Sequence, residues 1–176
     1  TQSEKVYNFE RIFNLRMDRA RSPLNGAEHD FVVLEPGPWV NVIPLLPGGE
    51  GVLVRQWRYG IAAPTLEIPG GMVEGESERA AAERELREET GYVARSWRRL
   101  GEVHPNPAFL TNRCGTWLAT DLERAGPPEG DGEEEIEVQL CPLAAIPQLI
   151  ASGEITHALV IAAFHHLALQ PERCAP

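Results

Sequence analysis

Apolar residues recur at different spacings along the chain, and the spacing separates strands from helices. In residues 52–59, VLVRQWRY, arginines alternate with bulky residues, which is typical of a half-buried strand. Residues 39–46 form a second β-rich run, and a turn rich in Pro and Gly separates the two runs. We predict strands within residues 4–20 and at residues 31–34, 39–46, 52–59, 96–103, 115–122 and 136–140.

A helix is expected between Ser77 and Gly91. Ser77 can cap its first turn, the run Ala80–Ala82 has high helix propensity, and Gly91 can end it. Two later helices are predicted at residues 142–150 and 155–169, the second with apolar residues at helical spacing. This order of elements, without an internal repeat or a long linker, predicts a mixed sheet sandwiched between helices.

Composition and charge narrow the possible partners. A chain of 176 residues with a formal net charge of −10 is the size of one domain and lacks the basic composition expected for binding nucleic acid or an anionic membrane. Cys114, Cys141 and Cys174 have neither metal-ligand spacing nor the pattern of a disulfide framework. No secretory signal or membrane-spanning apolar run is seen, so we expect a cytoplasmic enzyme.

Three carboxylates lie at helical spacing in the expected helix. Glu85, Glu88 and Glu89 stand at i, i+3 and i+4, so their side chains share one face. Like charges at these spacings destabilise a helix, and a bound divalent cation is the favoured compensator because hard ions take carboxylate oxygens together with substrate phosphates. The pattern therefore indicates metal-assisted chemistry on a phosphate.

The same segment resembles the signature of the Nudix hydrolases. The matching positions are Gly70, Glu76, Arg84, Glu85, Leu86, Glu88, Glu89 and Gly91, and Tyr92 stands where an aliphatic residue is usual. The resemblance implies an α/β/α sandwich with a mixed central sheet, preceded by antiparallel strands at the N terminus. It also implies an enzyme in which water attacks a pyrophosphate with the help of Mg²⁺, with Mn²⁺ as the alternative metal.

The resemblance also suggests how the signature residues divide the work. Glu85 and Glu89 would be the principal metal ligands, with Glu88 as a further ligand and a backbone carbonyl near Gly70 completing the shell. Arg84 is assigned to structure, because it can pair with Glu76 or Glu88 and hold the helix against the loop. The alternative for Arg84 is a contact with substrate phosphate.

Residues outside the signature resemble the ADP-ribose and nucleoside-diphosphate-sugar pyrophosphatases. The matching segments are residues 55–59 (RQWRY), 66–71 (LEIPGG) and 152–156 (SGEIT), together with Pro107. After that proline the ADP-ribose enzymes commonly carry Gly and, further on, Glu, where this chain has Ala108 and Asn112. ADP-ribose is therefore one expected substrate, and another nucleotide sugar such as GDP-mannose is the other.

Several residues are candidates for contacts with such a substrate. Arg55 and Arg58 could clamp the phosphates or the terminal sugar, and Glu67 could bind metal or the nucleobase. Trp39 or Trp57 could stack a nucleobase, although aromatic residues at strand spacing commonly belong to the core. For the general base we expect one residue of the acidic run Glu133, Glu134 and Glu135, with Glu134 as the first choice; the alternative is a solvated acidic run.

The resemblance leaves other assemblies and activities open. Residues 1–40 are expected to form N-terminal strands that exchange between the subunits of a homodimer, and residues 41–176 to form the Nudix hydrolase domain. A non-catalytic module that senses nucleotide sugars is an alternative, as is a pyrophosphatase of nucleoside triphosphates. The complete set of carboxylates argues against the first, and the N-terminal region with Pro107 argues against the second.

Overall fold

The computed structural model describes residues 2–9, 12–129 and 136–170. It divides into two compact units, which we describe separately. One unit consists of residues 1–38 and 104–113, and the other of residues 39–103 and 114–176. The predicted division at residue 40 did not include the loop at 104–113 in the N-terminal unit.

The N-terminal unit is a three-stranded antiparallel sheet. Its strands, in the order β1-β2-β3, are β1 (Gln2–Phe9), β2 (Phe13–Arg21) and β3 (Glu28–Pro36). The pairs Leu15↔Leu34 and Met17↔Val32 lie two residues apart along β2 and β3, so these four side chains share one face of the sheet. The loop at 104–113 joins this unit through hydrogen bonds between the backbones of Leu34 and residues 109 and 111.

The described residues of the second unit form two sheets and three α-helices. The four-stranded sheet, in the order β7-β4-β9-β8, consists of β7 (Gly70–Met72), β4 (Trp39–Pro44), β9 (Cys114–Arg124) and β8 (Tyr92–Val103). It is a mixed sheet, because β4 and β9 are parallel while the other pairs are antiparallel. The antiparallel three-stranded sheet, in the order β10-β5-β6, consists of β10 (Ile136–Pro142), β5 (Glu50–Arg58) and β6 (Ala63–Glu67).

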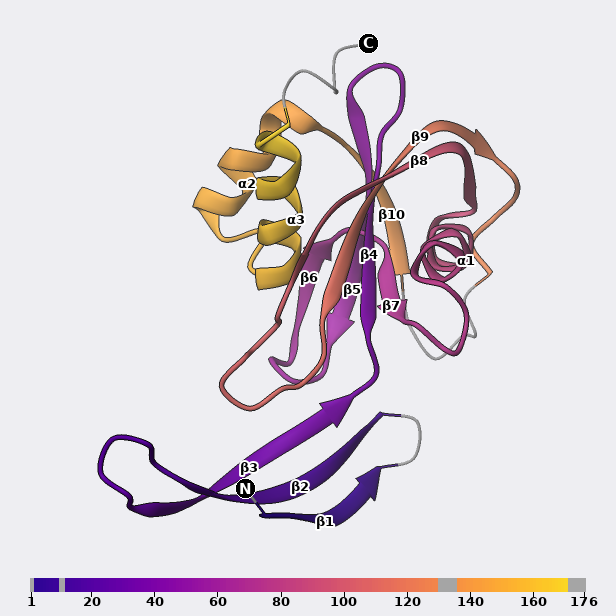
Figure 1. Ribbon diagram of the computed structural model, residues 1–176. Coiled ribbons are helices and arrows are strands. Elements are labelled where there is room, and N and C mark those ends of the chain that lie inside the picture. Colours follow the sequence, from indigo (N-terminus) through magenta and orange to yellow (C-terminus); the bar gives the residue numbers. More distant parts are fainter. Residues whose placement is uncertain (1, 10–11, 130–135, 171–176) are drawn as a thin grey trace. The chain divides into compact units, whose positions relative to one another are not determined.

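The helices cover the strands from two sides, as Figure 1 shows. They are α1 (Glu78–Thr90) on one side and α2 (Ile146–Ser152) and α3 (Ala158–Ala168) on the other. Strand β4 is buried on both faces: Val40 and Val42 belong to the core cluster of α1, whereas Ile43 belongs to the cluster of α3. By this alternation Asn41, which lies between the two valines, shares the α3 face with Ile43. The predicted α/β/α architecture with N-terminal antiparallel strands is confirmed.

Several predicted boundaries differ from the structure. The helix expected at 142–150 is a 3₁₀ turn, Leu143–Ala145, followed by the short α2. The helix expected from residue 155 begins only at Ala158, because His157 occupies the capping position before it. Strand β8 begins at Tyr92 rather than at residue 96. Strands β6 and β7 were not predicted. For β7 the reason is that it is three residues long and two of them are glycine, which is uncommon in strands.

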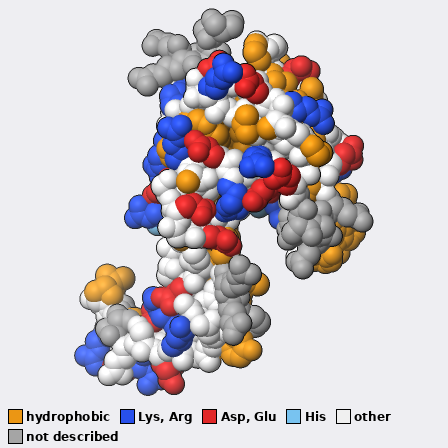
Figure 2. Space-filling view, turned by 90° about the vertical axis from the view of Figure 1, so that its right-hand side faces the viewer, with side chains coloured by type: hydrophobic (Ala, Val, Ile, Leu, Met, Phe, Trp, Pro, Cys, Tyr) orange, Lys and Arg blue, Asp and Glu red, His pale blue; other side chains and the backbone are white. Residues whose placement is uncertain are grey.

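Figure 2 shows acidic and basic side chains side by side on the face of the molecule where α1 lies. Ion pairs of α1 include Arg79 with Glu83 and Arg87 with Glu129. In the part of the chain that the structure describes, no helix is long and apolar enough to cross a membrane.

Candidate functional site

The signature segment folds as β7, a loop and α1. Strand β7 pairs with β4 through Gly70↔Asn41 and Trp39↔Met72. The Ser77 hydroxyl accepts a hydrogen bond of 3.2 Å from the amide of Ala80 and so caps the first turn of α1. The last turn ends at Gly91, whose φ of 73° lies in the left-handed region that glycine adopts without strain. Both ends of the helix are therefore determined by local sequence.

Glu85, Glu88 and Glu89 project from α1 as their spacing predicts. Glu85 and Glu89 are buried, whereas the Glu88 side chain is 42% exposed. All three are carboxylates on one helical face, and carboxylate oxygens are the donors that Mg²⁺ and similar hard cations take. Buried like charges require compensation, so the surroundings of these groups decide what the site can hold.

Arg84 supplies part of that compensation. Its guanidinium donates to Glu85 (2.8 Å), Glu88 (3.1 Å) and Glu76 (3.1 Å), and also to the carbonyl of Met72 (2.9 Å). Partial burial opposes the charge of Arg84, but the hydrogen bonds to the three carboxylates and the charge of Glu85 outweigh it and raise its pKa. The bond from Arg84 also holds the pKa of Glu76 below its ordinary value. This arginine joins α1 to β7 and to the loop between them.

The backbone of β7 approaches the same carboxylates closely. A methyl group at Gly71 would overlap the carboxylate of Glu85, so this carboxylate occupies the space that any other residue at position 71 would fill. The donor types and the close main chain fit a hard divalent cation. Among the described residues, however, no three His, Cys, Asp or Glu side chains converge as a metal site, and Arg84 holds oxygens of Glu85 and Glu88. Further donors would have to come from main chain, substrate or water.

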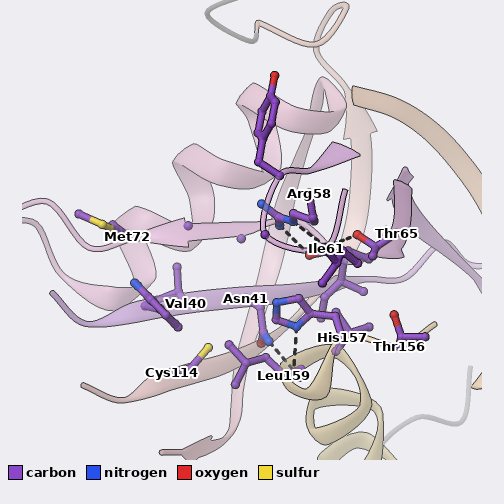
Figure 3. Close-up of a pocket in the computed structure, with 18 residues that line it drawn as sticks. Val40, Asn41, Arg58, Ile61, Thr65, Met72, Cys114, Thr156, His157 and Leu159 are labelled. Atoms are coloured by element: carbon purple, nitrogen blue, oxygen red, sulfur yellow. Dashed lines mark hydrogen bonds and ion pairs between the residues drawn. The ribbon is translucent and has the colours of Figure 1, made fainter. Parts of the chain in front are cut away.

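A cavity of about 510 Å³ borders on β7. Figure 3 shows that its walls come from β4, the β5–β6 hairpin, β7 and the start of α3. Three of the four predicted substrate-binding residues, Trp39, Arg58 and Glu67, line it, and so does Gly70. Arg55 does not: it lies in the same strand as Arg58 but pairs with Glu154 at 3.2 Å. The structure thus separates the two arginines that the sequence grouped together.

Arg58 and Glu67 form a two-pronged ion pair in the wall of this cavity. Both nitrogen–oxygen distances are 2.7 Å, and the Thr65 hydroxyl donates a further bond to Glu67. Burial favours the neutral form of Glu67, whose side chain is 4% exposed, but the bonds from Arg58 and Thr65 outweigh it and hold its pKa below the ordinary value. Glu67 is therefore a charged residue that orients Arg58 at the cavity.

Asn41 is a cavity residue that the sequence analysis missed. It is 6% exposed, and its side-chain nitrogen donates to the carbonyl of Leu159 at 3.3 Å. Its Oδ1 is buried without a hydrogen-bond partner among the described residues. Leaving a buried acceptor unsatisfied costs about 1–3 kcal/mol. The only sign of Asn41 in the sequence was a single polar amide side chain inside the otherwise apolar run 40–44, VNVIP.

His157 is a second residue that sequence reasoning did not assign to the site. Its Nδ1 accepts a hydrogen bond of 3.2 Å from the amide of Leu159 and caps α3. Figure 3 shows His157 and Asn41 both joined to Leu159. With Nδ1 as an acceptor, the neutral ring carries its proton on Nε2. The sequence signal was a histidine directly before a helix, which is weak because histidine is an uncommon cap.

The remaining candidates are placed as follows. Trp57 is 46% exposed and is not part of the cavity wall. Cys114 lines the cavity, but burial, with a smaller contribution from the charge of Glu78, raises its pKa to about 12. The thiol is therefore protonated and unreactive at neutral pH. Glu133, Glu134 and Glu135 lie outside the described residues.

Comparison with known proteins assigns the chain to a family. The model of the NUDIX domain matches residues 35–164, so the chain belongs to this family. It is 32% identical over 165 residues to an ADP-ribose pyrophosphatase of Mycobacterium tuberculosis, with 92% of this chain and 79% of the relative covered. It is 28% identical over 124 residues to a GDP-mannose pyrophosphatase of Citrobacter koseri, with 66% of this chain and 65% of the relative covered.

A solved structure described as an ADP compounds hydrolase has the same fold. The TM-score is 0.83 at 23% sequence identity, with 99% of this chain and 95% of that chain covered. Family membership and the related pyrophosphatases identify the chain as an enzyme, a Nudix pyrophosphohydrolase. Hydrolases of this family generally use divalent metal ions.

Proposed function

We propose that the chain hydrolyses the pyrophosphate bond of a nucleoside diphosphate sugar to a nucleoside monophosphate and a sugar phosphate. The observation that carries this proposal is the position of β7. Gly70 and Gly71 line the cavity, while Gly71 also abuts the carboxylate of Glu85 on α1. A substrate with its pyrophosphate at the α1 carboxylates has an adjoining cavity for one of its two end groups.

The relatives support this substrate class. Those reported above are named for ADP-ribose and for GDP-mannose, which share a nucleoside, a pyrophosphate and a sugar. We therefore propose ADP-ribose or a related nucleotide sugar such as GDP-mannose as the substrate. Arg58, oriented by Glu67, is our candidate for contact with the substrate phosphates or sugar, because it lines the cavity and a planar guanidinium matches the geometry of phosphate oxygens.

We assign Glu85 and Glu89 as the principal holders of a divalent metal, with Glu88 and the Gly70 carbonyl as further donors. The metal is proposed to be Mg²⁺, with Mn²⁺ as a substitute, because all these donors are hard oxygens. When bound, such an ion neutralises phosphate charge and lowers the pKa of coordinated water. Arg84 and Glu76 hold α1 against β7, which keeps the carboxylates in register with the backbone of Gly71.

A panel of substrates tests the reaction. Purified protein with Mg²⁺ or Mn²⁺ should hydrolyse one or more of ADP-ribose, GDP-mannose and UDP-glucose, and a chelator should abolish turnover. Glu89→Gln should remove activity while the protein stays folded. Glu83→Gln is the matched control, because Glu83 lies in the same helix but forms an exposed pair with Arg79. Turnover of nucleoside triphosphates alone, or full activity of Glu89→Gln, would contradict the proposal.

For the general base we propose one of Glu133, Glu134 and Glu135, with Glu134 as the first choice. A carboxylate that takes a proton from the attacking water loses this ability when changed to the amide. Replacing each of the three by Gln should give one variant with a large loss of kcat and an unchanged unfolding midpoint. Three active variants would show that the base lies elsewhere.

We also propose that the protein forms a homodimer through its N-terminal strands, with exchange of these strands between subunits. The three-stranded sheet supports this idea, because one of its faces carries Leu15, Met17, Val32 and Leu34. Of these, Val32 is 51% exposed in the single chain. An apolar sheet face that remains accessible to water favours association.

A further inference from the structure

Asn41 combines burial, an unpartnered acceptor and a place in the wall of the cavity. Its Oδ1 lacks a hydrogen-bond partner within the described chain, and the residue is buried, with only 6% of its surface exposed. The orientation of the amide follows from its surroundings. The carbonyl of Leu159 can only accept, so the side-chain nitrogen must face it and the oxygen must be the atom left over.

The position of Asn41 connects the cavity with the signature strand. In the β4–β7 ladder Asn41 pairs with Gly70, and a methyl group at Gly70 would lie 3.0 Å from the Asn41 Cα and 2.5 Å from the Val40 carbonyl. Glycine is required there because the two strands approach closely. Asn41 and Gly70 both line the cavity, so an end group held there would lie beside Asn41.

We propose that Asn41 determines specificity: its Oδ1 accepts a hydrogen bond from an N–H or O–H donor on an end group of the nucleotide sugar. This inference rests on the proposed function. The walls around Asn41 are largely apolar, with Val40, Ile68 and Leu159 among the lining residues. A substrate donor that enters such apolar surroundings needs an acceptor, which the Asn41 oxygen provides. A substrate that presents an acceptor at this place cannot bond to the Asn41 oxygen and leaves it unpaired.

Two parts of a nucleotide sugar carry suitable donors, the amino or ring N–H of a nucleobase and the hydroxyls of the terminal sugar. Matched substrate pairs separate them. One pair replaces the 6-amino group of the adenine in ADP-ribose by an oxo group, which turns a donor into an acceptor. The other pair removes single hydroxyls from the terminal sugar. For GDP-mannose, one pair of substrates changes a donor group of the guanine base, and the other pair removes single hydroxyls from the mannose.

The test measures kcat and KM for wild type and Asn41→Leu on the parent substrate and on each analogue. With wild type, the analogue that lacks the recognised donor should lose about tenfold in kcat/KM, mainly through KM. Asn41→Leu should lose the same factor on the parent and almost nothing on that analogue. Asn41→Ala provides a second variant of different volume, and unfolding midpoints establish that both are folded.

Thr116→Val is the control for a merely structural effect. Thr116 is buried beside Asn41 in β9 but is not part of the cavity wall, so this variant should keep the wild-type ratio between parent and analogues. An equal loss on parent and all analogues by both Asn41 variants would overturn the inference while leaving the proposed function intact. A wild-type protein that turns over no nucleotide sugar would overturn the proposed function, and this inference with it.

Discussion

Two arginines of the second unit, residues 39–103 and 114–176, have different surroundings and therefore different consequences for the site. We call this part of the chain the catalytic unit. Arg84 is shared among three carboxylates and a carbonyl, so it ties together β7, the loop and α1. Arg58 makes a two-pronged bond to one buried carboxylate, Glu67, and its own side chain is 37% exposed. The first arrangement stabilises the helix position. The second keeps a charged group at the wall of the cavity.

The Arg58–Glu67 pair predicts a pH dependence of stability. Because the pKa of Glu67 is lowered on folding, its charged form stabilises the protein above its ordinary pKa of about 4.5, and this contribution is lost as the pH falls through the lower, folded value. Glu67→Gln should therefore unfold about 2 kcal/mol more easily at pH 7. Urea unfolding across pH should show this difference shrinking only below about pH 4.5.

The exposed carboxylate Glu83, which pairs with Arg79 on the surface of α1, is the control for that measurement. Glu83→Gln should change the free energy of unfolding by less than about 1 kcal/mol at either pH. A Glu67→Gln variant as stable as wild type at pH 7 would show that the pair contributes nothing to folding.

Neighbouring glycines of β7 should respond differently to alanine. Gly70→Ala places a methyl group 2.5 Å from the backbone carbonyl of Val40, so we expect a loss of about 1–3 kcal/mol in the free energy of unfolding. The three atoms nearest to a methyl group at Gly71 all belong to the Glu85 carboxylate, at the end of a side chain that can rotate, so the fold should persist while this carboxylate moves. The kcat/KM of Gly71→Ala should fall about a hundredfold, because small misplacements of reacting groups are costly.

Unfolding curves and kinetics on the same two preparations separate these effects. If Gly71→Ala is folded and fully active, the position of Glu85 does not matter for the reaction. Equal losses of stability for the two variants would show that the backbone at Gly70 is not harder to displace than the Glu85 side chain.

At the scale of elements, α1 has both ends determined by its neighbours in sequence. Ser77 caps its start, and Gly91 ends it with a hydrogen bond of 2.8 Å to the Arg87 carbonyl. Gly91 also lies against the backbone of Gly126 and Pro127, where a side chain would overlap. The end of the helix is thus held both by its own conformation and by the loop after β9.

Substitutions at the two ends of α1 should reduce the stability of the protein by different amounts. Ser77→Ala should cost about 1 kcal/mol, the usual value for a lost cap. Gly91→Ala should cost more, because a left-handed conformation alone costs a non-glycine residue about 1–2 kcal/mol and the overlap with residue 126 adds to it. Thermal unfolding of the two variants checks the order. A smaller loss of stability for Gly91→Ala than for Ser77→Ala would mean that the loop after β9 moves readily to accommodate the methyl group.

At the scale of the whole molecule, the N-terminal sheet and the catalytic unit differ in how they are stabilised. The catalytic unit encloses two core clusters, around α1 and around α3. The N-terminal sheet has an apolar face that includes half-exposed Val32. A three-stranded sheet with one apolar face is stable when that face is covered. This difference is the physical basis for the proposed homodimer.

The assembly can be tested within β3. Sedimentation should give a dimer for the wild-type protein, and Val32→Asp should shift it toward monomer because a charge would enter the apolar interface. Phe31→Asp is the matched control, since Phe31 is equally exposed but lies on the opposite face of the same strand. A monomeric wild-type protein, or equal effects of both variants, would remove the proposed dimer face.

Features that depend on residues close together in the chain could be predicted from the sequence. The spacing of Glu85, Glu88 and Glu89, the cap at Ser77 and the stop at Gly91 all act within a few residues, so the carboxylate face and both ends of α1 followed from local rules. The order of strands and helices also predicted the α/β/α class.

The way in which distant segments form the cavity became known only from the folded structure. Arg55 and Arg58 look equivalent in sequence, yet the first pairs with Glu154 and the second with Glu67, because strand faces and partners separate them. Asn41 became a candidate only when α3 brought the Leu159 carbonyl to its nitrogen and left its oxygen unpaired. Contacts of this kind join residues far apart in the chain, and no local pattern encodes them.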